Sequence, residues 1–558
     1  MSYLKISKAT DLSGTDRKIY RALEIFPGFL SWTTLLSLLI LSYFQPVWVA
    51  YFIIAFDVYW LLRVVYLAIH LIASYRRLKN NVKVDWRAKC EAIKEWEDII
   101  HLLILPVSSE GLEIMRATFK ALVNDGYPTN KIIIALSMEG REGPSARERA
   151  EEIRKEFGHR FRNLFITIHP ENIAGEIKGK GANQAWAARE VKKEIIDKGN
   201  LDYNKIIVSV FDIDTCVIPG YFHCLTHKFL TVAKPHRASY QPIPVYHNNL
   251  WQAPFFARTT AISNTFWQMM QQIRQERLAT YSSHAMSWRA LVEIDFWSTN
   301  MVSEDSRIFW HCLCFYNGDY RVEPLNFPVS MDVCMDKSKL KTLKNLYKQQ
   351  RRWGWGVENI PFVIFNFFHP APFKQTPHLL DRNYININLL VDTKVRNYLK
   401  GAGQSIFDAK KQLLKRCGVK DKSKQFRWRK KLFYIFMQIE GFHSWATNAL
   451  IIAVIGWMPM VLGGDRFNAT VLSSNLPSVT RILMTMAMLG MVVSAIVSTL
   501  LLPKRPPQYG FFKTAKMVLQ WAFLPLTIIF FGAIPGLEAQ TRLMLGKYMG
   551  FWVTPKSR

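Results

Sequence analysis

The sequence predicts an α/β domain inserted between two groups of membrane-spanning helices. Long apolar runs lie near both ends of the 558-residue chain, and between them short apolar segments rich in β-branched residues alternate with amphipathic stretches. Hydrophobic residues make up 49% of the chain and charged residues 21%, which excludes a disordered polymer and a uniformly apolar transporter. A water-exposed part and a membrane part therefore share the chain.

The N-terminal region predicts a transmembrane hairpin. Residues 1–29 are polar and basic, and no small-residue cleavage site follows the next apolar run, so we expect a cytoplasmic segment and no removed signal peptide. Residues 30–75 are apolar and broken at Gln45-Pro46, which predicts two spans of about 20 residues each. By the positive-inside rule, the basic exit from this hairpin places both flanks in the cytoplasm. The basic residues at the exit are Arg76, Arg77, Lys79, Lys83, Arg87 and Lys89.

Residues 76–360 form the predicted cytoplasmic domain. Its apolar segments 101–109, 131–138, 163–170 and 205–212 read as buried strands. The stretches between them, such as 112–125, 145–157 and 183–197, carry apolar residues at helical spacing. Repeated strand, helix and strand units predict a parallel sheet, and ligands of such sheets bind at the carboxyl ends of the strands.

The C-terminal part is predicted to return to the membrane. Residues 361–431 form an interfacial and basic linker region, 432–535 hold three apolar segments that we expect to be membrane helices, and 536–558 form a basic tail. The loop between the second and third segments is basic and is expected to be cytoplasmic. Its basic residues are Lys504, Arg505, Lys513 and Lys516.

The basic tail also favours the cytoplasm, although three full crossings would place it outside. We therefore expect one of the three segments to be re-entrant or interfacial. Pro525 and Pro535 point to the last segment as the exception, and Phe433 to Trp445, interrupted by Glu440 and His443, reads as an interfacial amphipathic helix.

A surplus of positive charge, +29, is compatible with nucleic acid, anionic lipid or a phosphorylated substrate. No RNA- or DNA-binding signature accompanies it, so we expect no nucleic-acid partner. The seven cysteines show no repeating pair spacing, which favours reduced cytoplasmic thiols over a disulfide framework.

A pair of acidic residues follows the fourth predicted strand. Asp212 and Asp214 in FDIDT point the same way if the strand geometry continues past the strand. Mg²⁺ or Mn²⁺ takes one or two carboxylates and completes its shell with water and substrate phosphates, so the pair suits a nucleotide diphosphate. An Asp-x-Asp pair in an ordinary loop is the alternative, and the position at a parallel strand's carboxyl end favours the metal site.

A second acidic pair lies at Glu304 and Asp305 in SEDSRIFW. One of two adjacent carboxylates could act as a general base on an acceptor hydroxyl. The alternative is a solvated helix start, with Ser303 as the N-cap and the acids favouring the helix dipole.

Two further segments carry groups that bind phosphate or sugar. QQRRWGWG at 349–356 offers guanidinium groups for phosphate and indoles that stack on sugar faces, or else a basic and aromatic belt at the membrane interface. KGKGANQA at 178–185 is a Gly-interrupted basic loop that opens a helix, where Lys180 and free backbone amides could meet a phosphate.

Together, Asp-x-Asp, Glu-Asp and Gln-x-x-Arg-Trp, in this order between two sets of membrane helices, resemble glycosyltransferase family 2, the cellulose synthase and hyaluronan synthase group. The segment LPVSSEGLEIMRATFKAL also resembles the family's opening strand and helix. The resemblance covers residues 98–360 by motif and implies a GT-A (nucleotide-diphospho-sugar transferase-like) fold and an inverting transferase.

The resemblance also implies a role for each matching residue. Asp212 and Asp214 would bind the metal and the donor diphosphate, Asp305 would deprotonate the acceptor hydroxyl, and Lys180 would lie beside the donor. The pyrophosphate and the acceptor sugar would be held by Glu304, Gln349, Arg352 and Trp353. The family usually has an Asp after its second strand to bind the nucleobase end of the donor. This chain has MEGRE there, which offers Glu139.

The sequence thus predicts a multi-pass membrane hexosyltransferase, expected in the plasma membrane, that uses a nucleotide-sugar donor, with a UDP-sugar as the first expectation. The acceptor is a growing β-linked polysaccharide or a lipid-linked glycan. Few apolar segments are present for a polymer channel, so repeated and single addition both stay open. The alternative function is a catalytically silent membrane scaffold of an envelope-glycan assembly, and no protein partner is marked.

Overall fold

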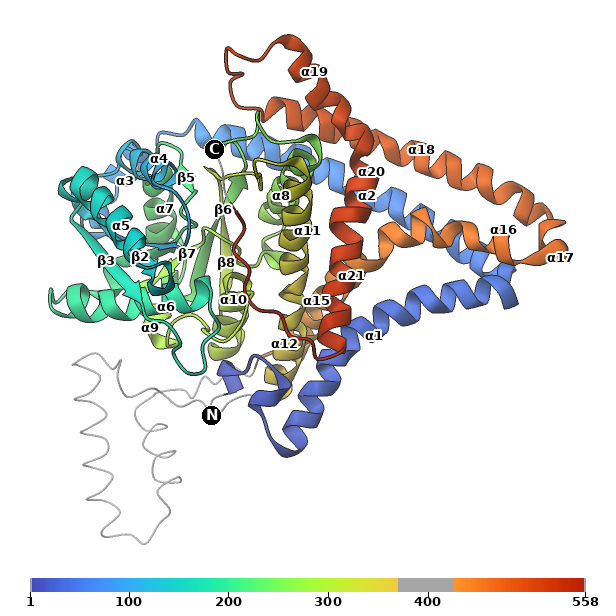
Figure 1. Ribbon diagram of the computed structural model, residues 1–558, viewed down its shortest axis with the longest axis horizontal. Helices are drawn as coiled ribbons and strands as arrows, with labels where there is room; N and C mark the ends of the chain where they lie inside the picture. Colours follow the sequence, from blue (N-terminus) through green and yellow to red (C-terminus); the bar gives the residue numbers. More distant parts are fainter. Residues whose placement is uncertain (1–2, 370–425, 556–558) are drawn as a thin grey trace, which may run out of the picture.

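The computed structural model describes residues 3–369 and 426–555. A mixed α/β domain lies at one end of the molecule and long apolar helices extend from it (Figure 1). Most of the predicted linker region 361–431 lies outside the described residues, as do the last three residues of the predicted basic tail.

The four predicted strands form one half of an eight-stranded sheet of order β3-β2-β1-β4-β7-β6-β8-β5. Strands β1 to β4 pair in parallel, with Leu103 of β1 opposite Ile134 of β2 and Ser209 of β4. The prediction of a parallel sheet is confirmed for this half. Its strands are β1 (Ile100–Val107), β2 (Ile132–Glu139), β3 (Asn163–His169) and β4 (Ile206–Val210).

The other half of the sheet is mixed, and the sequence analysis does not predict it. Strand β7 pairs antiparallel with β4 and β6, whereas β6 and β8 pair in parallel and β5 pairs antiparallel with β8. These strands are β5 (Cys216–Val217), β6 (Ala238–Val245), β7 (Ala285–Ser287) and β8 (Arg321–Ser330).

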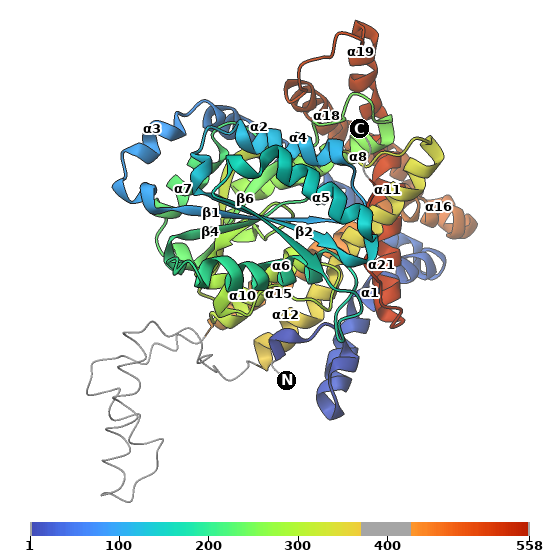
Figure 2. The same ribbon diagram turned by 60° about the vertical axis from the view of Figure 1, so that its left-hand side comes forward.

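Two hydrophobic cores cover the two faces of the sheet, because side chains alternate along each strand. Leu103 and Leu105 face the core formed with α4, α5 and α7, whereas Leu102 and Ile104 face the core formed with α6, α9 and α10. Figure 2 shows α4 and α5 on one side of the strands and α6 and α10 on the other. The domain helices are α3 (Trp86–Glu91), α4 (Leu112–Val123), α5 (Pro144–Phe157), α6 (Lys180–Val191), α7 (Tyr221–Thr231), α8 (Phe255–Ile273), α9 (Trp288–Glu293), α10 (Glu304–Phe315), α11 (Lys339–Gly354) and α12 (Asn359–Phe368).

In the described part of the chain, four helices are long and apolar enough to cross a membrane, or five if a bent pair counts as one span. The predicted hairpin is present as α1 (Gly14–Phe44) and α2 (Pro46–Val82), which meet at Gln45. The bent pair, α15 (Trp428–Ala453) and α16 (Met458–Leu462), turns by 41°. The remaining helices are α17 (Gly464–Asn468), α18 (Val471–Leu500), α19 (Phe511–Leu519), α20 (Leu524–Ile528) and α21 (Ile534–Met544).

The last apolar segment runs in a different direction from the other long helices. α2 and α18 lie side by side along the long axis of the molecule, whereas α20 and α21 stand crosswise to them and alongside α11 (Figures 1 and 2). The segment Phe511–Met544 meets the length and hydropathy criteria for a span all the same. That this segment is re-entrant or interfacial stays a prediction. Pro525 and Pro535 lie in the first turns of α20 and α21 and do not end the segment.

Residues Phe433 to Trp445 do not form a separate helix, because they lie inside the continuous helix α15. The first turns of α15 pack on the α/β domain, where Tyr434 is buried against Phe309 and Trp310 of α10. The long apolar helix α15 and the α/β domain thus share a hydrophobic core.

Candidate functional site

The candidate site lies where parallel strands end. Strand β4 ends at Val210, and FDIDT follows it directly. Helix α6 begins at Lys180 after the loop from β3, and α10 begins at Glu304. Crossover connections of a parallel sheet bring such loops and helix N-termini to one edge.

The two aspartates of FDIDT were predicted to point the same way if strand geometry continues past the strand, and this condition is not met. The chain leaves the strand at Val210 and makes a tight turn, in which the Thr215 amide donates to the Asp212 carbonyl at 2.8 Å. A turn rotates successive side chains differently from a strand. The Asp212 side chain stays one quarter exposed, whereas Asp214 is buried and accepts a hydrogen bond from the Asp332 amide at 3.0 Å.

Lys180 lies between two predicted acidic groups. Its Nζ is 2.7 Å from Oδ1 of Asp212 and 2.9 Å from Oδ2 of Asp305. Three segments that are far apart in the sequence therefore meet at one ammonium group. Burial lowers the pKa of Lys180, but the attraction of Asp212, Asp305 and Glu304 outweighs burial and raises that pKa above its ordinary value. The lysine stays cationic.

Glu304 is buried, which contradicts the interpretation of this segment as a solvated helix start. Burial and the neighbouring Asp305 carboxylate raise the pKa of Glu304 above its ordinary value. Ser303 makes no side-chain cap. Its hydroxyl instead donates to Oε1 of Glu358 at 2.7 Å. The start of α10 is thus hydrogen-bonded to Glu358, which directly precedes α12. Asp305 is the acid of the pair that keeps access to solvent, with one quarter of its side chain exposed.

Close packing of two helix starts explains one glycine of the KGKG loop. A Cβ on Gly181 would lie 2.9 Å from the Ser298 carbonyl oxygen and 3.1 Å from Cβ of Glu304. Any larger residue would therefore push α6 away from α10. With the two helices in contact, the positive ends of both dipoles point at the same place, which favours an anion there.

Residues from the mixed half of the sheet hold the aspartates, and the sequence analysis missed them. Ser282, just before β7, donates its hydroxyl hydrogen to Oδ2 of Asp212 at 2.8 Å. The Asn248 amide donates to the Asp214 carbonyl and to Oδ1 of Asp332, each at 2.8 Å. Serines and asparagines are common in loops, so a single sequence carries no signal that selects these.

The predicted acceptor and pyrophosphate residues lie in the last turns of α11. Gln349, Arg352 and Trp353 are all partly buried, and Gln349 and Trp353 share a face because they are four residues apart. Of the three, Arg352 is near enough to Glu304 to affect its titration. Among the described residues, no hydrogen bond joins this turn to Asp305 or Lys180.

A C-terminal segment also reaches the site. Phe551 packs against the KGKG loop so closely that a Cβ on Gly179 would lie 2.6 Å from its ring. The Arg352 guanidinium lies 5.0 Å from the centroid of the same ring, and the Lys348 ammonium lies 5.2 Å from that of Trp552. The sequence signal for this contact is the aromatic pair Phe551 and Trp552 in a basic tail.

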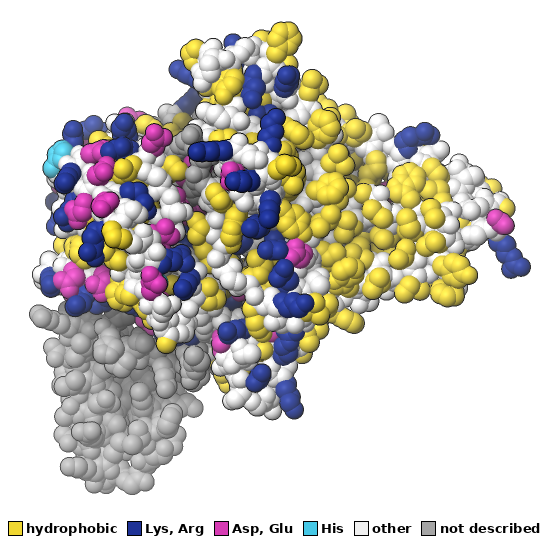
Figure 3. Space-filling view, viewed as in Figure 1, with side chains coloured by type: hydrophobic (Ala, Val, Ile, Leu, Met, Phe, Trp, Pro, Cys, Tyr) yellow, Lys and Arg dark blue, Asp and Glu magenta, His cyan; other side chains and the backbone are white. Residues whose placement is uncertain are grey.

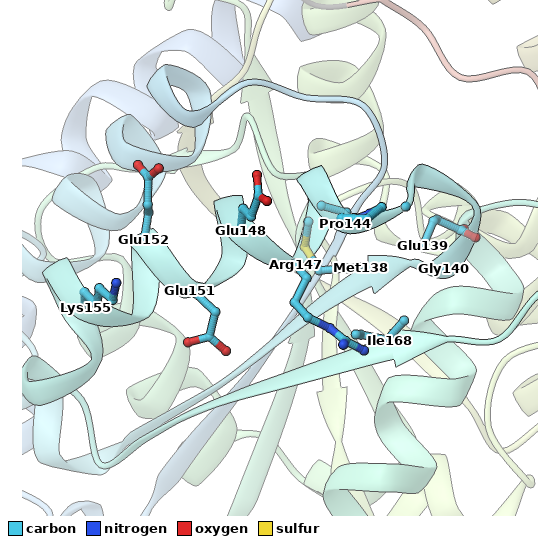
Figure 4. Close-up of a pocket in the computed structure, with 12 residues that line it drawn as sticks. Met138, Glu139, Gly140, Pro144, Arg147, Glu148, Glu151, Glu152, Lys155 and Ile168 are labelled. Carbon is cyan, nitrogen blue, oxygen red and sulfur yellow. The ribbon is translucent and has the colours of Figure 1, made fainter.

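Glu139 ends β2 and lines a cavity of about 720 Å³ beside α5 (Figure 4). Its Oε2 is 3.5 Å from Nδ1 of His169 and 3.6 Å from Nε of Arg141. Burial lowers the pKa of His169, but the hydrogen bonds with Glu139 and Glu176 outweigh burial and raise that pKa. The opening is charged along α5, where Figure 4 shows Arg147, Glu148, Glu151 and Lys155.

The carboxylates fit a divalent cation that takes most of its ligands from elsewhere. No group of three or more His, Cys, Asp or Glu side chains within residues 3–369 and 426–555 could hold a metal ion alone. Mg²⁺ and Mn²⁺ are commonly bound by one or two carboxylates plus water and phosphate oxygens. Asp214 and Asp212, the latter next to the cationic Lys180, supply such carboxylates.

No family model matches the chain, and no curated protein matches it. Among solved structures, the chain is similar to the mannosyltransferase PcManGT from Pyrobaculum calidifontis in complex with GDP-Man and Mn²⁺, at 12% identity and a TM-score of 0.35, over 69% of this chain and 97% of that one. It is also similar to S. aureus TarS 1–349 in complex with UDP-GlcNAc, at 10% identity and a TM-score of 0.30, over 72% of this chain and 91% of that one. Likenesses this weak assign no family, so any assignment of function has to come from the residues of the site.

Proposed function

We propose that this protein is a membrane-embedded, inverting hexosyltransferase of the glycosyltransferase family 2 type. It moves a sugar from a nucleotide diphosphate donor to a growing β-linked polysaccharide or a lipid-linked glycan. The observation that carries the proposal is the contact of Lys180 with both Asp212 and Asp305 where helices α6 and α10 begin. In the sequence, Lys180 and Asp212 are 32 positions apart, and Asp212 and Asp305 are 93 positions apart.

In this mechanism the Asp305 carboxylate accepts the proton of the acceptor hydroxyl. The hydroxyl oxygen forms a bond to the anomeric carbon as the bond from that carbon to the diphosphate oxygen breaks, with the leaving group on the opposite face. Attack from the face opposite the leaving group inverts the configuration. The partial exposure of Asp305 supports this role, because a base has to reach its substrate, whereas the neighbouring Glu304 is buried.

The donor diphosphate is placed against Asp212, Asp214 and Lys180. A bound Mg²⁺ or Mn²⁺ at the aspartates would neutralise charge on the leaving diphosphate. Lys180 adds a permanent cation, and the N-termini of α6 and α10 add two dipoles of the same sign. Glu139 and the cavity beside α5 are proposed to take the nucleobase end of the donor, with a UDP-sugar as the first candidate.

The acceptor is placed on the α11 side. Gln349 and Trp353 share one face of the helix, and Arg352 lies near Glu304, so we assign these amide, indole and guanidinium groups to the acceptor that reaches Asp305. α11 lies alongside α21 next to the apolar helices (Figure 1). A lipid-linked or membrane-extruded acceptor fits this position.

The helix directions support a cytoplasmic placement of the α/β domain in the plasma membrane. If Phe511–Met544 lies along the membrane surface, then α1, α2, α15 with α16, and α18 make four crossings. An even number of crossings returns the basic tail to the side of the basic N-terminal segment, as the positive-inside rule requires.

The proposal is tested by donor hydrolysis and sugar transfer with the purified protein in lipid. UDP- and GDP-sugars are screened with Mg²⁺ and Mn²⁺, and nucleotide diphosphate release is read beside product length. Release from one donor that is lost in Asp212→Asn and Asp214→Asn supports the enzyme. A product ladder means repeated addition and one product means single addition, whereas no release from any donor by a folded sample supports the silent scaffold.

A further inference from the structure

The segment that joins α18 to α20 has a composition unlike the rest of the chain. From residue 466 to 537 there is no Asp or Glu, whereas Lys504, Arg505, Lys513 and Lys516 lie close together in the sequence around α19. In the described parts of the chain, none of these four residues forms a salt bridge. Other exposed lysines do, such as Lys205 with Asp98 and Lys234 with Asp319. The segment therefore carries uncompensated positive charge.

The same segment exposes large apolar side chains. Phe511 is 72% exposed, Phe512 80% and Leu519 70%. In Figure 3, Lys and Arg side chains gather over this part of the molecule at the edge of the apolar surface of the long helices. Bulky apolar side chains beside basic ones are typical of a helix that lies in a membrane interface.

The inner side of the segment is anchored on the α/β domain. The Tyr509 ring stacks on Trp251, with centroids 5.9 Å apart and planes at 18°. Arg258 of α8, which is buried, donates from Nε to Oε1 of Gln520 at 2.9 Å. Tyr509 and Gln520 thus hold the segment against the α/β domain, while Phe511, Phe512 and Leu519 stay exposed.

The anchor leads directly to the candidate site. Trp251 lies three residues after Asn248, whose amide bonds both the Asp214 carbonyl and the Asp332 carboxylate. Asn249 of the same turn is joined to Val333 by hydrogen bonds in both directions, at 3.0 and 2.7 Å. A shift of Tyr509 would therefore be transmitted to the turn that holds Asp214.

We propose that residues 504–519 form a docking surface for the anionic phospholipid headgroups of the leaflet that faces the α/β domain, and that Tyr509 and Trp251 couple this docking to the donor site. The surface fits this partner by charge, since each basic residue at an anionic membrane strengthens binding about fivefold. The coupling, but not the surface, rests on the proposed function.

The surface is tested with the full-length protein in nanodiscs of phosphatidylcholine, with or without about a third of phosphatidylglycerol. A ligand that binds the folded state raises the thermal unfolding midpoint, so the anionic discs raise it for the wild type. A variant with Lys504, Arg505, Lys513 and Lys516 all changed to Gln loses at least half of this rise. The matched control changes Lys94, Lys120, Arg160 and Arg162 to Gln, which are exposed on the α/β domain, and keeps the rise.

Two outcomes of the thermal experiment overturn the surface. One is an equal midpoint of the wild type in both kinds of disc, and the other is a full rise in the variant without the four charges. A rise that shrinks with added salt supports it, because salt screens exposed charges.

The coupling is tested by the affinity for the nucleotide sugar found in the hydrolysis screen. The wild type binds this donor more tightly in anionic discs, whereas Tyr509→Ala binds it equally in both and keeps the thermal rise. A lipid-dependent affinity in Tyr509→Ala overturns the coupling. If no donor binds in either disc, the proposed function fails, and the thermal experiment still decides the surface.

Discussion

The two sides of the candidate site are held by different interactions. On the domain side, Lys180 contacts Asp212 and Asp305 through charged groups no more than 3.1 Å apart. On the α11 side, Arg352 contacts the Phe551 ring, and among the described residues no hydrogen bond joins it to Asp305 or Lys180. Charge-assisted hydrogen bonds add geometric specificity as well as energy, whereas an exposed cation–ring contact contributes about 0.5–1 kcal/mol. The proposed function accordingly places the chemistry on the domain side and an exchangeable substrate on the α11 side.

The largest effect is expected for Asp305→Asn. The substitution keeps the size and removes the base, so transfer falls by about a hundredfold to ten-thousandfold while donor binding stays close to that of the wild type. Rates of nucleotide release and a donor titration measure the two quantities. Asp319→Asn, which changes an exposed aspartate paired with Lys234, serves as the control. Loss of donor binding in Asp305→Asn would remove the base assignment.

The second effect is expected for Lys180→Met, which tests whether the domain side depends on one cation. Asp212 and Asp305 would then repel each other without an ammonium between them, and each lost charged hydrogen bond costs about 1.5–3 kcal/mol. Both the unfolding midpoint and donor affinity fall. Lys192→Met, at the exposed pair with Asp197, is the matched control. An unchanged donor affinity would assign Lys180 a structural role only.

The sequence predicted the domain side better than the α11 side for a physical reason. Lys180 and Asp212 follow the predicted strands β3 and β4, so their meeting at one edge follows from the parallel topology, whereas Asp305 in the mixed half was placed there only by the family resemblance. The burial of Asp214 did not follow, because the turn after Val210 is held by hydrogen bonds from Asn248 and Asp332, which lie in the unpredicted mixed half of the sheet.

The contact of Phe551 with the KGKG loop also could not be predicted. It joins residues 179 and 551, and nothing local in either segment specifies such a distant partner. That Phe511–Met544 is re-entrant or interfacial stays a prediction from charge balance, because three full crossings would place the basic tail outside. Composition alone would have counted the segment as a span.

A third prediction concerns the α11 side. Trp353→Ala removes an indole from the approach to Asp305 and raises the KM for the acceptor about tenfold, the worth of one stacking contact of about 1.4 kcal/mol. The kcat, the donor KM and the unfolding midpoint change little. Trp428→Ala, at an exposed indole on α15, is the control. Unchanged acceptor kinetics would favour the membrane-belt interpretation of QQRRWGWG.

The smallest effect is expected for Glu304→Gln, and it appears as a pH dependence of stability. Because the pKa of Glu304 is raised in the folded protein, its contribution to stability is full below the ordinary value of 4.5 and is lost as pH rises through the folded value. The wild-type unfolding midpoint therefore falls with rising pH in this window, and Glu304→Gln, which stays neutral, has a flatter profile. Thermal unfolding of both proteins across this pH range measures the difference. Parallel profiles would mean that Glu304 is ionised beside Asp305, and Lys180 would then compensate three carboxylates instead of two.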